Sequence, residues 1–105
     1  MKKTAAAAVL MFVFAGFSLA ADAKAGAAAY DKSCKGCHGA TGAGNPAIAK
    51  MLSTTIPELG SAEVQGKSDG DLAKVITDGK GKMKGIKTLS SSPEEVVAFL
   101  RTMKK

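Results

Sequence analysis

The chain is poor in the large side chains that build most protein cores: its 105 residues include no Trp, one Tyr and four Phe. Three of the four Phe lie within the first twenty residues, and the other 85 residues keep only Tyr30 and Phe99. A domain of that size buries barely enough apolar surface to offset chain entropy, and aromatic side chains contribute most to that burial. The composition therefore excludes a large enzyme, a multidomain protein and a membrane bundle, and it leaves open what fills the core.

Arginine and histidine are also scarce, with one residue of each, and there are two Cys. Without an Arg cluster or a basic run interleaved with aromatics, the sequence does not predict nucleic-acid binding. Lys and Arg together number 15 against 9 Asp and Glu, which gives a formal net charge of +6. Such a surplus suits acidic protein partners or anionic surfaces, and it also serves ordinary solubility.

The N-terminus has the pattern of a secretory signal peptide. Lys2 and Lys3 give a positive start, residues 5–17 are uncharged and apolar, and small residues precede Ala20 and Ala23. Signal peptidase recognises small residues at those positions. We predict cleavage after Ala20, with Ala23 as the alternative site.

A retained membrane anchor is the competing interpretation of the same stretch. The uncharged run over residues 4–21 reaches 18 residues only by including weakly apolar Ala, Gly, Ser and Thr. A comfortable span needs about 20 predominantly apolar residues. We therefore predict a signal peptide over residues 1–20 and a mature domain over residues 21–105, exported to the periplasm without stable membrane insertion after cleavage.

Four helices are predicted, over residues 24–35, 46–52, 68–79 and from Ser92 onward. The last has the clearest start, with Ser92 as N-cap, Pro93 at the first position and Glu95 as the capping-box partner. Apolar residues then recur at i, i+3, i+4 and i+7, which predicts one buried stripe made of Val96, Phe99, Leu100 and Met103. Glycine-rich turns separate the helices, over residues 39–44, 60–70 and 79–85. No alternating apolar and polar run predicts a strand, so the expected class is all-α with long loops.

Residues 34–38, Cys-Lys-Gly-Cys-His, contain both Cys and the only His of the chain. This C-x-x-C-H arrangement is the attachment signature of c-type haem. Two thiols three positions apart can each add to one vinyl group of the porphyrin and form a thioether. The adjacent His38 then supplies a neutral imidazole nitrogen to the iron.

Other interpretations of the motif fit less well. A zinc site needs about four ligands, and no second Cys or His cluster supplies them. A thioredoxin-like redox pair requires a βαβ context that the sequence lacks. A disulfide between Cys34 and Cys37 is feasible in an exported protein, but so short a loop would stabilise little. We predict one covalently bound haem c, attached through Cys34 and Cys37, with His38 as an axial ligand.

The second axial ligand must come from elsewhere, and the mature chain offers Met51, Met83 and Met103. Met103 belongs to the apolar stripe of the last helix, which favours a core position. Met51 follows His38 by only thirteen residues, so that reaching the opposite haem face would be awkward. Met83 lies in a glycine-rich loop between two Lys, an unusual place for an apolar residue unless something draws it inward. Met83 is therefore the predicted ligand; a thioether favours ferrous iron and raises the reduction potential.

From Gly26 to Met103 the sequence resembles the class I c-type cytochromes, in particular small bacterial monohaem electron carriers. Gly26 and Tyr30 match the Gly and aromatic residue that precede the haem motif in that family, and Phe99 matches the aromatic that packs across the first helix. Pro46 matches a proline whose carbonyl orients the axial imidazole, and residues 76–83 are similar to the axial-Met loop. Lys84 stands where members often have Pro.

The resemblance implies a cytochrome c fold of about four short helices wrapped around one haem. It also implies a soluble, monomeric electron carrier with His38 and Met83 as axial ligands, rather than an enzyme. The alternative is a haem sensor or small peroxidase-like protein whose sixth iron site is open. Lysines are expected to ring the haem edge and to steer acidic redox partners during transient docking; they are Lys35, Lys80, Lys82, Lys84 and Lys87.

The porphyrin would also fill the core that lacks aromatics. Pro46 and Phe99 are candidates for the haem pocket or its packing. The other candidates are aliphatic residues of the predicted short helix and of the second half of the chain: Ile48, Leu52, Ile56, Leu59, Leu72, Val75, Ile76, Ile86 and Leu89. Tyr30 and Phe99 are expected to clamp the two terminal helices. The haem-free chain is then expected to be largely unfolded.

Overall fold

The structure is a computed structural model that describes residues 22–105. Its helices and strands follow the chain in the order α2 (Ala23–Ser33), α3 (Lys35–His38), α4 (Pro46–Met51), α5 (Ala62–Gln65), α6 (Asp69–Asp78), β1 (Gly79–Lys80), β2 (Met83–Lys84) and α7 (Pro93–Arg101). The predicted signal peptide and the cleavage site after Ala20 lie outside the described residues. Among residues 22–105, no helix has the length and apolar character needed to cross a membrane.

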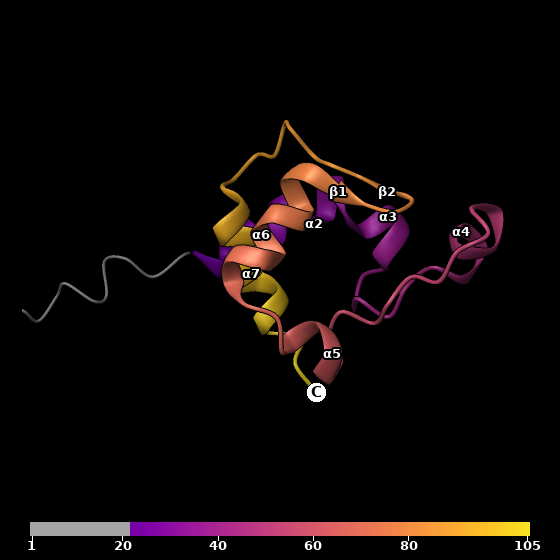
Figure 1. The fold of residues 1–105 in the computed structure, drawn as a ribbon. Coiled ribbons are helices and arrows are strands. Elements are labelled where there is room, and N and C mark those ends of the chain that lie inside the picture. The colour runs from indigo at the N-terminus through magenta and orange to yellow at the C-terminus, as the bar shows by residue number, and fades with distance from the viewer. Residues whose placement is uncertain (1–21) are drawn as a thin grey trace, which may run out of the picture.

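Helices α2 and α7 form the centre of the fold, where they pack against each other (Figure 1). Their backbones approach closely at Gly26. A Cβ atom at Gly26 would collide with the backbone carbonyl of Glu95 in α7, so only glycine allows this approach. Near the crossing, the rings of Tyr30 and Phe99 lie 5.2 Å apart between centroids, at an interplanar angle of 58°. This pair confirms the predicted clamp between the terminal helices.

The predicted start of the last helix is confirmed. Ser92 Oγ accepts from the N–H of Glu95 at 3.2 Å, and the Glu95 carboxylate accepts from the N–H of Ser92 at 3.1 Å. Both bonds satisfy backbone donors that a helix end leaves free. The helix ends at Arg101, before Met103, which is half-buried and packs against the core.

Helix α6 packs against α7 and supplies the third side of the core. Ser68 caps it by accepting from the N–H of Asp71 at 3.1 Å, and Gly79 follows its last residue, both as predicted. The buried apolar residues form one cluster, most of it on α2, α6 and α7: Ala29, Tyr30, Cys34, Leu59, Val64, Leu72, Ala73, Ile76, Val96, Val97 and Leu100.

Several elements differ from the sequence predictions, among them a hairpin and helix α5. Strands β1 and β2 form an antiparallel hairpin in which Gly79 pairs with Lys84 and Lys80 with Met83, where only a loop was expected. Two-residue strands are too short to show an alternating pattern, so the sequence could not indicate them. Helix α5 interrupts the predicted loop over residues 60–70; its N-cap is Ser61, whose Oγ accepts from Val64 N–H at 3.4 Å.

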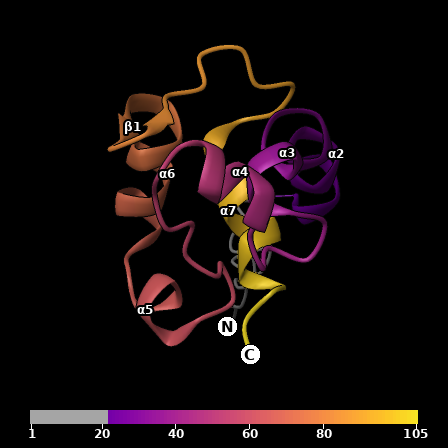
Figure 2. The same ribbon diagram turned by 90° about the vertical axis from the view of Figure 1, so that its right-hand side faces the viewer.

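Helix α4 lies at the side of the molecule, apart from the bundle of α2, α6 and α7 (Figures 1 and 2). None of its residues is buried, and Met51 at its end is 70% exposed. Asn45 caps it, accepting from the N–H groups of Ala47 at 3.0 Å and Ile48 at 3.4 Å, and Pro46 occupies the first position as predicted. The helix is therefore held at its N-terminal end, next to the loop that follows His38.

Candidate functional site

The Cys34–His38 segment begins where α2 ends. Cys34 interrupts the helical path, and its carbonyl accepts from the N–H of Cys37 at 3.2 Å and of His38 at 3.0 Å. Cys34 is buried, Cys37 is exposed, and both thiols are free. The segment therefore forms a single tight turn, called the attachment turn below, that carries both thiols and the imidazole.

Burial determines the protonation state of these groups. It lowers the pKa of His38, so that the ring is neutral at pH 7 and can offer a lone pair to a metal. Burial also raises the pKa of the Cys34 thiol, with a smaller contribution from the charge of Cys37. One turn thus carries a neutral imidazole and two thiols, the groups that covalent haem attachment requires.

The imidazole is not oriented in the way that was expected. Within residues 22–105, the Nδ1 atom of His38 is buried and has no hydrogen-bond partner. The expected bond to the Pro46 carbonyl is therefore not formed in this structure. Pro46 is the first residue of α4, where a carbonyl faces the N–H of the fourth residue onward along the helix rather than a neighbouring loop.

The backbone around the imidazole is held by the loop that follows it. The Tyr30 hydroxyl donates to the carbonyl of Gly39 at 2.6 Å, and Gly44 N–H donates to the carbonyl of His38 at 2.7 Å. Burial raises the pKa of Tyr30 to about 12, so this hydroxyl stays protonated as a donor well above neutral pH. The loop thus returns onto the turn through direct hydrogen bonds.

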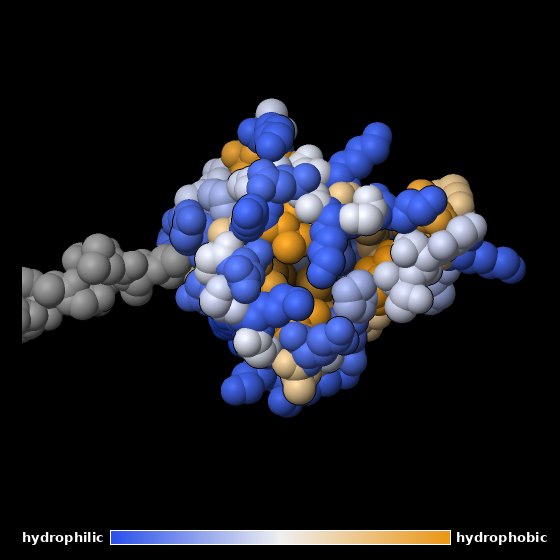
Figure 3. Space-filling view, in the orientation of Figure 1, coloured by the Kyte–Doolittle hydropathy of each residue, from blue (hydrophilic) through white to orange (hydrophobic). Residues whose placement is uncertain are grey.

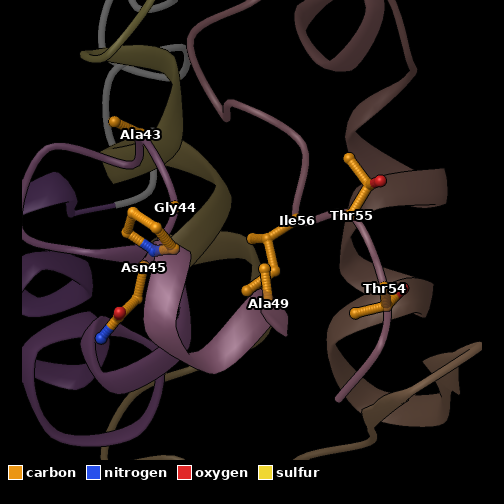
Figure 4. A pocket seen from close by; sticks show the side chains of 8 residues that line it. Ala43, Gly44, Asn45, Ala49, Thr54, Thr55 and Ile56 are labelled. Atoms are coloured by element: carbon orange, nitrogen blue, oxygen red, sulfur yellow. The ribbon is translucent and has the colours of Figure 1, made fainter. Parts of the chain in front are cut away.

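The predicted pocket residues fall into two groups. Leu59 is part of the buried cluster, and Phe99 packs against it. Ile48, Leu52 and Ile56 are only half-buried, and Pro46 is exposed. Two of them, Pro46 and Ile56, border a pocket of about 380 Å³ between α4 and residues 54–56. Figure 4 shows Ile56 directed toward Ala49 of α4 across this pocket.

Hydrophobic side chains gather at the centre of the face seen in Figure 3, between charged ones. They lie over the region that α2, α3, α5 and α6 surround in Figure 1. An apolar area enclosed by the attachment turn and the α6 side of the fold suits one face of a flat, largely apolar cofactor.

The three methionines occupy different environments. Met51 is exposed, and Met103 packs against the core, as expected for a residue that is not a ligand. Met83 is half-buried in β2, whereas the flanking Lys82 and Lys84 are exposed. Ligation of iron by Met83 stays a prediction. Among residues 22–105, no three His, Cys, Asp or Glu side chains lie close enough together to hold a metal ion by themselves.

Sequence reasoning gave three residues no role in the site, although the structure shows that they shape it. Asn45 caps α4 and bonds back to the attachment turn, and an Asn before a Pro that opens a helix is a recognisable N-cap signal. Gly79 and Gly85 fix the hairpin that carries Met83: a Cβ atom on Gly79 would lie 2.5 Å from the Met83 carbonyl, and one on Gly85 would collide with the Thr77 carbonyl. Their roles depend on tertiary contacts that no local pattern reveals.

Comparison with known proteins shows the family of the chain. A family model described as cytochrome C oxidase, cbb3-type, subunit III matches residues 21–100. The solved structure of the KustC0563 c-type cytochrome is similar with a TM-score of 0.62 and 26% sequence identity, over 76% of this chain and 98% of that chain. No curated protein sequence matches significantly. The predicted fold and the covalent haem c are thereby confirmed, and the chain belongs to the cbb3-type cytochrome c oxidase subunit III family of monohaem c-type cytochrome domains.

Proposed function

We propose that this domain is a periplasmic electron carrier whose iron is ligated by His38 and Met83. The haem supplies one-electron exchange between Fe(III) and Fe(II). Members of the cytochrome c family typically carry electrons. The attachment turn contributes a half-buried, neutral imidazole, and a second ligand from the protein would keep both axial positions filled in either oxidation state.

The observation that carries the Met83 assignment is the way its hairpin is fixed. The N–H of Ile86 donates to the carbonyl of Ile76 at 2.7 Å, which ties the end of the hairpin to α6. Gly79 and Gly85 pack without side chains against the backbone of neighbouring residues. A half-buried thioether on a hairpin fixed in this way supports the proposal of a lasting bond to iron.

Optical spectra of the oxidised and reduced protein test this ligation. We expect a low-spin ferric spectrum with the thioether-to-iron charge-transfer band, and loss of that band in Met83→Ala. Met51→Ala serves as the matched control, because Met51 is exposed and its removal should leave the band unchanged. A high-spin wild-type spectrum with ready binding of carbon monoxide would refute the carrier and favour the haem sensor or peroxidase-like alternative.

Three exposed lysines on the hairpin are proposed to steer an acidic redox partner. No carboxylate among residues 22–105 forms an ion pair with Lys80, Lys82 or Lys84, whereas Lys35 pairs with Asp31 at 3.2 Å and Lys87 with Asp78 at 3.8 Å. The positive charges of Lys35 and Lys87 are thus partly neutralised. Of the five lysines expected to steer a partner, we therefore propose only the three on the hairpin. The name of the matched family suggests a terminal oxidase as one class of partner. Docking should be weak and the free carrier monomeric.

Charge reversal tests the steering. The triple variant Lys80→Glu, Lys82→Glu and Lys84→Glu should slow electron transfer with an acidic partner strongly at low salt and little at high salt. A control with the same net charge reverses three other exposed lysines, Lys24, Lys32 and Lys104. Equal slowing by both triple variants would show that net charge alone matters and would refute docking at the hairpin.

Cleavage of the signal peptide after Ala20 is proposed because it preserves the start of α2. Asp22 caps that helix by accepting from Lys24 N–H at 2.9 Å. Cleavage after Ala23 would remove the cap. Amino-terminal sequencing of protein recovered from the periplasm should begin at Ala21; a start at Lys24, or protein found only in the cytoplasm, would contradict the proposal.

A further inference from the structure

Tyr30 lies on α2 about one helical turn before the attachment turn, and it contacts that turn at both ends. Its backbone carbonyl accepts from the N–H of Cys34 at 2.8 Å, and its hydroxyl donates to the carbonyl of Gly39 at 2.6 Å. The first bond belongs to the ordinary helical pattern, which any residue at position 30 would provide. The second bond requires a hydroxyl at the end of an aromatic ring, so it depends on tyrosine.

The packing of α2 against α7 fixes the position of this hydroxyl. Tyr30 is 2% exposed, and the centroid of its ring lies 5.2 Å from that of Phe99 on α7. A buried tyrosine hydroxyl normally has a hydrogen-bond partner, and the carbonyl of Gly39 is that partner here. A rigid side chain with only two torsion angles therefore connects the core of the fold to the end of the attachment turn.

The residue that the Tyr30 hydroxyl binds is the most flexible type of residue. Gly39 directly follows His38 and has φ +84° and ψ 163°, a conformation that is essentially restricted to glycine. Glycine loses more conformational freedom on folding than any other residue. A bond from a rigid side chain therefore fixes the direction of the peptide group that follows His38.

Other bonds to the attachment turn come from a part of the chain that lies apart from the core. Gly44 and Asn45 bind carbonyls of the turn, but they lead into α4, none of whose residues is buried. Figures 1 and 2 show α4 beside the bundle of α2, α6 and α7 rather than within it. Tyr30, by contrast, belongs to the buried cluster. It therefore ties the end of the turn directly to the packed core.

We propose that Tyr30 is a positioning residue for haem ligation: by binding Cys34 and Gly39 at the two ends of the attachment turn, it sets the place of His38 relative to the two thiols. The residue acts through the backbone of the turn, not by contact with the iron or a substrate. The inference requires the covalent haem of this family but not the electron-carrier function. It would hold for a haem sensor as well, and failure of Met83 to bind iron would leave it intact.

Removing the hydroxyl alone tests this role. Tyr30→Phe keeps the ring that packs on Phe99 and loses the bond to the carbonyl of Gly39. That carbonyl also accepts from the N–H of Gly42 at 3.3 Å, so the loop keeps one bond and the variant should fold. The haem-methyl proton resonances of the ferric holoprotein report the orientation of the axial ligands. We expect Tyr30→Phe to shift these resonances, because the peptide group after His38 loses its bond to the core.

Thr102→Val is the matched control. The Thr102 hydroxyl also donates to a backbone carbonyl at 2.6 Å, that of Phe99, but it lies after the end of α7 and away from the attachment turn. This variant should keep the wild-type resonances even if its denaturant midpoint falls as far as that of Tyr30→Phe. Wild-type resonances in Tyr30→Phe would overturn the proposal, as would equal shifts in both variants, because loss of stability alone would then explain them.

A second variant covers the case in which Tyr30→Phe is not recovered with haem. Tyr30→4-aminophenylalanine keeps a hydrogen-bond donor at the end of a ring of the same size. Recovery of this holoprotein with resonances close to those of the wild type would support the proposal, because the donor is then what the site requires. Failure to recover it with haem, or recovery with strongly shifted resonances, would overturn the proposal.

Discussion

Replacing Gly79 by alanine should displace the hairpin that carries Met83. A Cβ atom on Gly79 would lie 2.5 Å from the carbonyl oxygen of Met83 and 2.6 Å from the N atom of Gly85. Ordinary contacts of a Cβ atom begin near 3.4 Å, so the Met83 backbone must move by about 1 Å in a close-packed environment. Gly79 also has φ +85° and ψ 172°, a region that is essentially restricted to glycine.

The steric clash and the backbone strain at position 79 both destabilise the Gly79→Ala variant. Backbone strain of this kind costs about 1–3 kcal/mol, and overpacking costs a similar amount, so Gly79→Ala should lose about 3 kcal/mol of unfolding free energy. A shift of about 1 Å is large compared with the tolerance of a metal–ligand bond, which is about 0.2 Å. The ferric charge-transfer band should therefore weaken or disappear, and the reduction potential should fall as the thioether is lost.

Gly81→Ala is the matched control, two residues along the same hairpin. Gly81 has φ +59°, and no atom lies within 4 Å of the Cβ position, so alanine adds only the left-handed strain of about 1–2 kcal/mol. Its charge-transfer band should persist. If Gly79→Ala keeps the band and unfolds at the same denaturant concentration as Gly81→Ala, the hairpin does not position Met83 and the reasoning fails.

Other substitutions and conditions test the rest of the fold. Gly26→Ala should force α2 and α7 apart and cost about 1–3 kcal/mol or more by denaturant unfolding, in contrast to a near-neutral Gly36→Ala. Ser92→Ala should cost about 1 kcal/mol through loss of the capping box, measured in the same way. Phenolate absorbance should give Tyr30 a pKa near 12 in the folded protein, against about 10 in the unfolded chain. The contribution of its burial to the free energy of unfolding is therefore complete below pH 10 and is lost as the pH rises toward 12. The Cys34→Ala, Cys37→Ala chain should show little helix by far-ultraviolet circular dichroism, and native-like helicity would contradict that.

The elements that could be predicted are those whose signals are local. Ser92, Pro93 and Glu95 specify the start of α7 within four residues, and the attachment motif is contiguous. Helix α5 escaped prediction because its support is distant: the Gln65 side chain donates to the carbonyls of Leu59 at 2.8 Å and Leu100 at 2.9 Å. Leu100 lies 35 residues after Gln65, so a local sequence pattern cannot indicate this contact.

The same distinction applies within the site. Cys34, Cys37 and His38 were identifiable because their spacing is itself the chemical requirement. Gly44 and Asn45 bind backbone carbonyls of the turn, and every residue type carries such a carbonyl, so the sequence does not mark these bonds. This is why Asn45 was missed and why an orienting bond was assigned to Pro46, although the structure leaves His38 Nδ1 without a partner.

The scarcity of aromatics has a clear counterpart in the packing. Tyr30 is the one large side chain that is almost fully buried among residues 22–105; the other almost fully buried side chains are no larger than Val96 and Val97, and burying a side chain of that size stabilises a fold by only about 1.5–3 kcal/mol. The cluster formed by α2, α6 and α7 is therefore small. Ile48, Leu52 and Ile56 remain half-buried outside it, on the side of the fold that follows the attachment turn. A covalently attached porphyrin supplies the apolar surface that these residues need, so haem attachment should determine whether the whole chain folds.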